Sequence, residues 1–93
     1  MSDLDFQIKV SVDKETGTVV AAYFQMREGK ATRVLELADG KAFANYGSTG
    51  KLLGIELLAP CEITVLDQLF KKEPKVIKDF LMRTAPPEML KAA

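Results

Sequence analysis

The sequence predicts an α+β fold in which a five-stranded antiparallel β-meander is followed by two short C-terminal helices. Three observations support this prediction. Short runs of β-compatible residues fill residues 6–58 and are separated by turn signals. In the clearest stretch, residues 39–58, two apolar runs flank a Gly-Ser-Thr-Gly turn. From residue 63 onward, apolar residues recur at helical spacing instead.

The first two strands differ in how their apolar residues are distributed. Residues 6–12 alternate between apolar and polar, which predicts a strand with one buried face. The apolar positions are Phe6, Ile8, Val10 and Val12. After a turn at residues 13–17, the second strand is predicted at residues 18–26, and its central run, Val19–Phe24, is apolar on both faces.

Three more strands are predicted at residues 30–38, 41–46 and 51–58. Asp39-Gly40 is typical of a primed two-residue hairpin turn between the first two of these. The last contains Leu-Leu-Gly-Ile-Glu-Leu-Leu and is apolar on both faces, like the second strand of the domain. Strands joined by short turns are expected to pair with their neighbours in sequence, as in a meander.

A first helix is predicted where the strand pattern ends. Pro60 has no backbone N–H and cannot continue a central strand. Thr64 and Asp67 have the spacing of a weak capping box, which predicts that the helix begins there. The apolar residues that follow at helical spacing are Val65, Leu66, Leu69 and Phe70.

A second helix is predicted at residues 74–83, with Glu73 as the N-cap and Pro74 in the first helical position. Its apolar stripe consists of Val76, Ile77, Phe80 and Leu81. Pro86-Pro87 should end it, so that residues 88–92 form at most a final turn.

The length of 93 residues predicts a single domain, residues 1–93, made of a sheet (6–58) and a helical tail (63–92). Thirteen basic residues balance thirteen acidic ones, so no net charge attracts nucleic acid or an anionic membrane. Residues 71–93 hold six basic and three acidic side chains, which predicts a solvated lysine face. Short apolar runs and an acidic N-terminus predict a cytoplasmic protein without a membrane span or signal peptide.

No catalytic, cofactor-binding or metal-binding residue is predicted. The chain has no histidine, the commonest acid–base group and zinc ligand. Its one cysteine, Cys61, is expected to be a small residue at a buried junction. Asp13 and Glu15 lack the third acid of a hard-cation site. Gly47–Lys51 differs from a phosphate-binding loop, because Leu52 and a strand follow it.

Glu56 is the only charged residue within residues 52–58. If it were buried, it would need a partner such as Arg33 or Lys41. Otherwise, we expect it on the solvent-exposed side of an edge strand. Nucleic-acid binding would require aromatic residues set among basic ones, and Lys9, Arg33 and Lys41 are too dispersed for that.

The second and fifth strands predict a homodimer. Strands that are apolar on both faces are usually covered on both faces. Two short helices can cover one face of a small sheet, and a second copy of the chain could cover the other. Alternatively, the helices wrap around an edge, or the sheet curls enough to shield itself.

Three segments of the chain share features with a known family: Tyr23–Lys30, Arg33–Gly40 and Gly50–Leu58. They resemble the small bacterial and archaeal proteins named domain of unknown function 2283, over about residues 8–60. The fitting positions are Asp13, Glu15, Tyr23, Gly29, Gly50, Gly54, Ile55, Glu56 and Leu58. Gly47 departs from the pattern, in which an acid begins the last turn. The resemblance implies a small antiparallel sheet in a prokaryotic protein and no established activity.

The leading hypothesis is a non-enzymatic, homodimeric interaction module whose basic helical tail binds a protein partner. One alternative is an antitoxin-like protein whose C-terminal helical segment, residues 71–93, binds a toxin. It comes from the resemblance, since some members of that family look as if they are encoded beside toxins. A further alternative is a small-ligand binder with a pocket between sheet and helices near Cys61 and Glu56.

Overall fold

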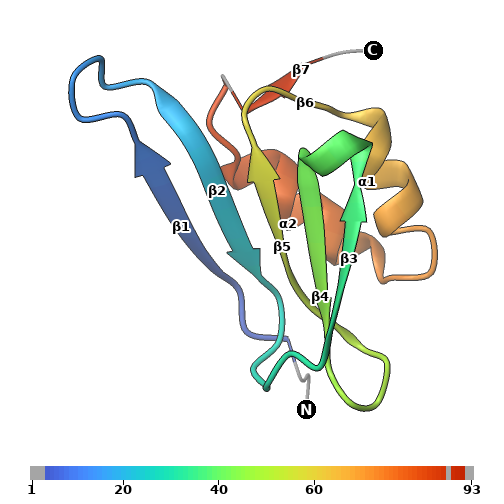
Figure 1. Cartoon of the computed structure of the whole chain (residues 1–93). Coiled ribbons are helices and arrows are strands. Elements are labelled where there is room, and N and C mark those ends of the chain that lie inside the picture. Colours follow the sequence, from blue (N-terminus) through green and yellow to red (C-terminus); the bar gives the residue numbers. More distant parts are fainter. Residues whose placement is uncertain (1–3, 88, 92–93) are drawn as a thin grey trace.

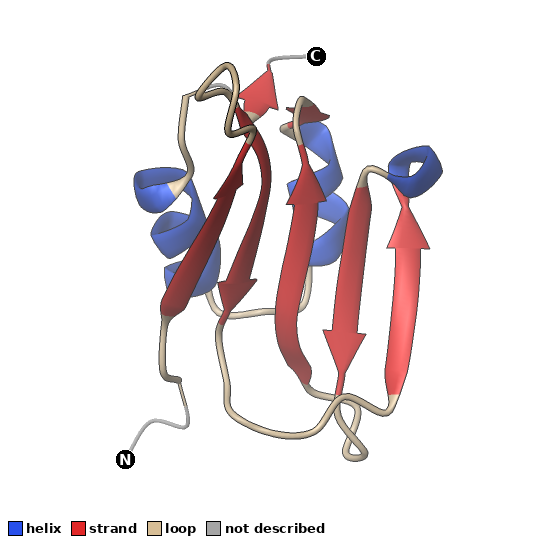
Figure 2. Cartoon of the chain, turned by 60° about the vertical axis from the view of Figure 1, so that its left-hand side comes forward, coloured by secondary structure: helices blue, strands red, loops and turns tan. Residues whose placement is uncertain are grey.

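The computed structural model describes residues 4–87 and 89–91 and confirms an α+β fold with a five-stranded antiparallel sheet and C-terminal helices. The strands are β1 (Gln7–Val12), β2 (Val19–Gln25), β3 (Arg33–Leu37), β4 (Ala42–Tyr46) and β5 (Leu52–Leu58). Helices α1 (Thr64–Leu69) and α2 (Lys75–Thr84) both lie on one face of the sheet (Figure 1). The other face is open, as Figure 2 shows with both helices behind the strands.

The strand order differs from that of the predicted meander. It is β1-β2-β5-β4-β3, so β5 pairs with β2 and β3 lies at an edge. The two strands with apolar residues on both faces therefore occupy the interior of the sheet, where side chains of flanking strands shield them. Met26 and Arg27 both donate their backbone N–H to the carbonyl of Leu53, at 2.8 and 3.1 Å, and fix the end of the β2–β5 pairing.

The core lies between the sheet and the two helices. The sheet contributes fully buried Phe24, Ile55 and Leu57, with Ala42 and Ala44 directly opposite the last two. The helices contribute Leu66, Leu69, Ile77 and Leu81. These four belong to the predicted apolar stripes, whereas Val76 of the second stripe is 46% exposed.

The first helix starts without the predicted capping box. Ile63 is the N-cap of α1, and no side-chain capping hydrogen bond is present. The Asp67 carboxylate instead forms an ion pair with Lys78 of α2. The second helix begins one residue later than predicted, because Pro74 has ψ 144° and serves as its N-cap.

The predicted final turn at residues 88–92 is wrong at Leu90 and Lys91, whereas Met89 lies in a turn. Leu90–Lys91 form a short strand, β7, which pairs parallel with β6 (Cys61–Glu62). The backbone N–H of Cys61 donates to the carbonyl of Met89 at 2.8 Å. Met89 lies in a turn just before β7, where its N–H donates to the carbonyl of Pro86 at 2.9 Å, and its side chain is fully buried in the core. Residues 88 and 92 lie outside the described residues.

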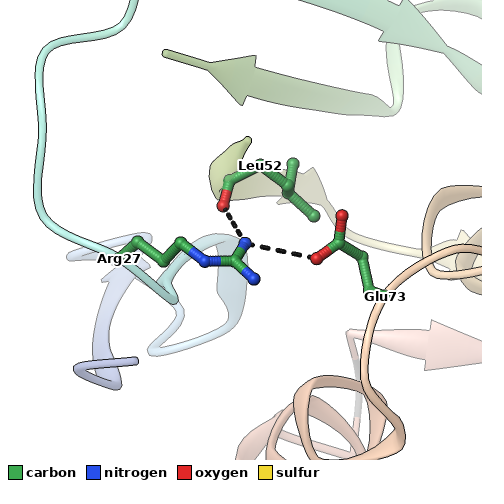
Figure 3. Close-up of polar contacts among 3 residues, drawn as sticks. All are labelled: Arg27, Leu52 and Glu73. Carbon is green, nitrogen blue, oxygen red and sulfur yellow. Dashed lines mark hydrogen bonds and ion pairs between the residues drawn. The ribbon is translucent and has the colours of Figure 1, made fainter. Parts of the chain in front are cut away.

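Arg27 links the sheet to the helical segment, as Figure 3 shows. Its Nη1 donates to the carbonyl of Leu52 at 2.7 Å and lies 3.2 Å from Oε1 of Glu73, between α1 and α2. The side chains of Arg27 and Glu73 are only 11% and 18% exposed. Because both charges are largely removed from water, each depends on the other for compensation.

Candidate functional site

The open face of the sheet carries both charged and aromatic residues. One row of directly paired residues crosses all five strands, and in spatial order it comprises Lys9, Tyr23, Glu56, Phe43 and Glu36. The three charged side chains are exposed and the two aromatic ones are half-buried. Glu56 is therefore solvent-exposed, as predicted, but it lies in the central strand rather than at an edge.

Gly54 leaves a gap in the centre of this face that Tyr23 covers. The tyrosine hydroxyl lies over the glycine and accepts a hydrogen bond from Nδ2 of Asn45 at 3.3 Å. Beside Tyr23 there is a hollow of about 340 Å³ whose charged lining residues are Lys9 and Glu56. Glu56 therefore lines a hollow on the open face of the sheet.

The apolar side of β1 is exposed, which contradicts the prediction of a strand with one buried face. All six residues of β1 are exposed. Its helix-facing residues Ile8, Val10 and Val12 are 38%, 41% and 52% exposed, and Val20 at the start of β2 is 45% exposed. We call these four residues the hairpin patch. It arises because six- and ten-residue helices cover the centre of the sheet, where Ala22 and Phe24 of β2 are buried, and leave β1 uncovered.

An aromatic stack marks the end of the hairpin that is anchored to the helices. The rings of Phe6 and Phe80 are stacked with centroids 4.4 Å apart, and Phe24 meets Phe80 edge-on at 6.3 Å. A hollow of about 310 Å³ opens beside Phe6 and Phe80, and Val76 of α2 also lines it. Charged Asp79 and Arg83 line the same hollow, so its walls are partly polar.

Cys61 lies at the buried junction between sheet and helices, as predicted. It lines a hollow of about 250 Å³ together with Asp39, Lys41 and Glu62. Burial raises the pKa of the thiol, and the nearby Glu62 carboxylate raises it further, while Lys41 acts in the opposite direction. The thiol therefore keeps its proton at neutral pH and lacks the thiolate character of a nucleophile.

The turn beside this hollow has an unusual backbone. Asp39 and Gly40 have positive φ angles of 53° and 83°, as the predicted primed turn requires, and Lys41 closes the turn by donating to the carbonyl of Ala38 at 3.1 Å. Ala38 also has a φ of 53°. Two successive non-glycine residues in the left-handed region hold the rim of the hollow in a conformation of limited freedom.

The predicted ligand pocket near both Cys61 and Glu56 is not formed. Cys61 belongs to the hollow on the helix side, whereas Glu56 is exposed on the open face beside a different hollow. The structure therefore separates the two residues by the thickness of the sheet. The hollow at Cys61 is also smaller than about 300 Å³, the lower end of the usual range for ligand pockets.

Two turns that could have carried chemistry have structural roles. Asp13 accepts hydrogen bonds at Oδ1 from the backbone N–H groups of Glu15 and Thr16, at 2.8 and 3.4 Å, and so stabilises the β1–β2 turn. Gly47–Gly50 form a tight turn closed by the Gly50 N–H and the Gly47 carbonyl at 3.0 Å, and β5 follows. Neither turn forms a cation site or a phosphate-binding loop.

Arg27 and Glu73 are the part of this arrangement that sequence reasoning missed. They are far apart in the chain: Arg27 follows the predicted second strand, and Glu73 is the predicted N-cap of the second helix. No local pattern relates them, because their meeting depends on the β2–β5 pairing. A hollow of about 260 Å³ beside Arg27 is lined also by Lys30, Lys51 and the acidic Glu28.

Among residues 4–87 and 89–91, no group of three or more acidic or cysteine side chains could hold a metal ion. Within the same residues, neither helix has the length and apolar character needed to cross a membrane. No protein-family model, curated protein or solved structure matches the chain. The resemblance to the domain of unknown function 2283 family stays a prediction from the sequence.

Proposed function

We propose that this protein is a non-enzymatic interaction module that acts as a homodimer, with the hairpin patch as its self-association surface. The observation that supports this proposal is the exposure of Ile8, Val10 and Val12 on the helix side of β1, with exposed Val20 nearby at the start of β2. Adjoining apolar side chains on the surface of a small domain are typical of an interaction site. A second copy supplies a surface of the same character, as an isologous interface requires.

The hairpin patch suits this role better than the open face. A two-fold axis through the middle of the open face would bring the two copies of Glu56 together, and like charges in contact disfavour association. The polar side chains of β1, including Lys9, point to the open face and away from the patch. The charge of Lys9 therefore lies on the opposite side of the strand from the apolar contact.

The helical tail offers a second surface for a protein partner. Lys71, Lys72 and Lys75 are exposed around the start of α2 and would suit an acidic partner. In the antitoxin alternative, this segment binds a toxin. Ile77 and Leu81 are buried against the sheet of their own chain, so such a partner would meet the outer side of α2 rather than its apolar stripe.

The small-ligand alternative has one observation in its favour, the hollow lined by Cys61, Lys41 and Glu62. Its volume of about 250 Å³ lies just below the usual range for ligand pockets and would suit a small ligand. Thermal-shift measurements across a set of small anions and metabolites would test this alternative, because a ligand that binds only the folded state raises the melting temperature. A flat response would count against it.

Light scattering over a concentration series tests the homodimer. We expect the wild-type chain to be a dimer at micromolar concentration and Val10→Lys to dissociate at least about tenfold more readily, because a lysine would be desolvated in the interface. Val34→Lys is the matched control: Val34 is 58% exposed on β3, at the opposite edge, and its replacement should leave the dimer intact. A wild-type monomer at these concentrations would contradict the proposal.

A further inference from the structure

We propose that the dimer forms by antiparallel pairing of β1 with β1 of a second copy, with Val10 on the two-fold axis. The two sheets would then join edge to edge into one sheet of ten strands, since each copy contributes five. This inference rests on the proposed homodimer and adds the mode of association to it. The partner is a second copy of this chain.

The backbone of β1 is suited to such pairing because β1 is an edge strand. In Figure 1 it lies at the left of the sheet, with no other element of the described chain on its outer side. The N–H groups of Asp5 and Asp13 donate toward the β2 side, to Met26 and Thr18. Backbone groups alternate in direction along a strand, so those of Ile8, Val10 and Val12 point to the free edge.

The other edge strand, β3, is better protected against pairing. It has five residues against six in β1, and two of them, Arg33 and Glu36, are charged. Arg33 is also held over the ring of Tyr46, with Cζ 4.7 Å from the ring centroid. Charged residues on a short strand are a common device against edge-to-edge association, whereas β1 has only Lys9.

Charge selects the register. Residues that face each other across an antiparallel pair point to the same face of the joined sheet, which limits the possible registers. Two of these registers pair most of β1 with its copy. In one, Lys9 lies on the two-fold axis, and in the other, Val10 does. The first would set Lys9 directly opposite the partner's Lys9, which is unfavourable. The second sets Lys9 opposite the partner's Ser11 and avoids that contact.

The Val10 register also pairs the apolar residues with one another. Val10 faces the partner's Val10, and Ile8 faces the partner's Val12, all on the helix side of the sheet. These are the residues whose backbone groups point to the free edge, so each would form a hydrogen-bonded pair. The apolar side chains of β1 in the hairpin patch would thus lie next to those of the second copy on the helix side of the joined sheet.

Disulfide trapping tests this register. Lys9 and the partner's Ser11 would form a non-hydrogen-bonded pair, with Cα atoms about 4.5 Å apart, within the range that a disulfide spans. We expect an equal mixture of Lys9→Cys and Ser11→Cys chains to give a covalent heterodimer under mild oxidation, identified by its mass. Each variant alone should stay uncrosslinked, as should the wild-type chain, whose Cys61 is buried.

Other crosslinking patterns would overturn the inference. Crosslinking of Lys9→Cys alone would place Lys9 on the axis, and crosslinking of Ser11→Cys alone would shift the register the other way. If light scattering finds a dimer and no variant or mixture crosslinks, the proposed function stands and the edge pairing is wrong. If every variant and the wild-type chain are monomers, the homodimer itself fails.

Discussion

Replacement of Gly54 by alanine tests the close packing at the centre of the open face. A Cβ at this position would lie 2.5 Å from Oη of Tyr23 and 2.8 Å from its Cζ, and 2.8 Å from the carbonyl oxygen of Phe24. Side-chain carbon atoms do not approach other heavy atoms this closely, so something must move. The tyrosine ring can rotate away, but the Phe24 carbonyl belongs to β2, whose backbone is paired with β5.

The expected loss of stability follows from two opposing contributions. Overpacking of this kind costs about 1–3 kcal/mol. Alanine restricts the unfolded chain more than glycine does, which raises the free energy of unfolding by about 0.4–1 kcal/mol. We therefore expect the free energy of unfolding to fall by about 1–2 kcal/mol, and the melting temperature by about 4–8 °C for each kcal/mol in a domain of this size.

Urea denaturation of a double-mutant cycle with Tyr23→Ala measures how much of this loss comes from the tyrosine. Tyr23→Ala removes two of the three close contacts and leaves the one to the Phe24 carbonyl. The cost of Gly54→Ala should therefore drop by at least about 0.5 kcal/mol in the Tyr23→Ala background. An equal cost in both backgrounds, or a stabilised Gly54→Ala single variant, would refute the reasoning.

Three further predictions concern the core and the helix side. Arg27→Met should lower the free energy of unfolding by about 1–3 kcal/mol in the same denaturation assay, because the largely buried Glu73 carboxylate loses the Arg27 guanidinium as a hydrogen-bond donor. Glu73→Gln should lower it by less. Met89→Ala should cost about 2–5 kcal/mol, since Met89 is fully buried; a neutral result would show that residues 89–91 do not close the core. Because burial raises the pKa of the Cys61 thiol, the folded state retains this proton to higher pH than the unfolded chain does. The protonated thiol therefore contributes to stability below about pH 8.5, and this contribution is lost as the pH rises further. The melting temperature of Cys61→Ala should accordingly decline less steeply between neutral and alkaline pH than that of the wild-type chain.

The positions of the elements could be predicted from local sequence. All five strands and both helices lie within a few residues of their predicted bounds, because alternation, glycine turns and helical spacing are local properties. The strand order could not be predicted in the same way. The two equally apolar strands, β2 and β5, bury more of their apolar side chains as neighbours in the interior of the sheet. This preference can be recognised only when arrangements of the whole sheet are compared.

The candidate surface was less predictable than the fold. Alternation in β1 shows that Ile8, Val10 and Val12 share a face, but not whether a helix is long enough to cover that face. The burial of Cys61 follows from its place at the sheet–helix junction, and it was predicted. The Arg27–Glu73 pair and strand β7 depend on contacts between distant segments, so no local sequence pattern predicts them.

The pairing of β2 with β5 has a consequence for how the domain opens. It divides the sheet into two units that are each continuous in sequence, the β1–β2 hairpin and the β3–β4–β5 segment. The pairing of β2 with β5 joins residues far apart in the chain, so it forms slowly relative to local hairpins. Local opening along it would release β1 and β2 as one cooperative unit once the contacts of Phe6 and Phe24 with Phe80 and the ion pair of Arg27 with Glu73 are broken as well. Amide hydrogens of β2 that bond to β5 should then exchange together with those of β1, and contact with a second copy along β1 would slow both.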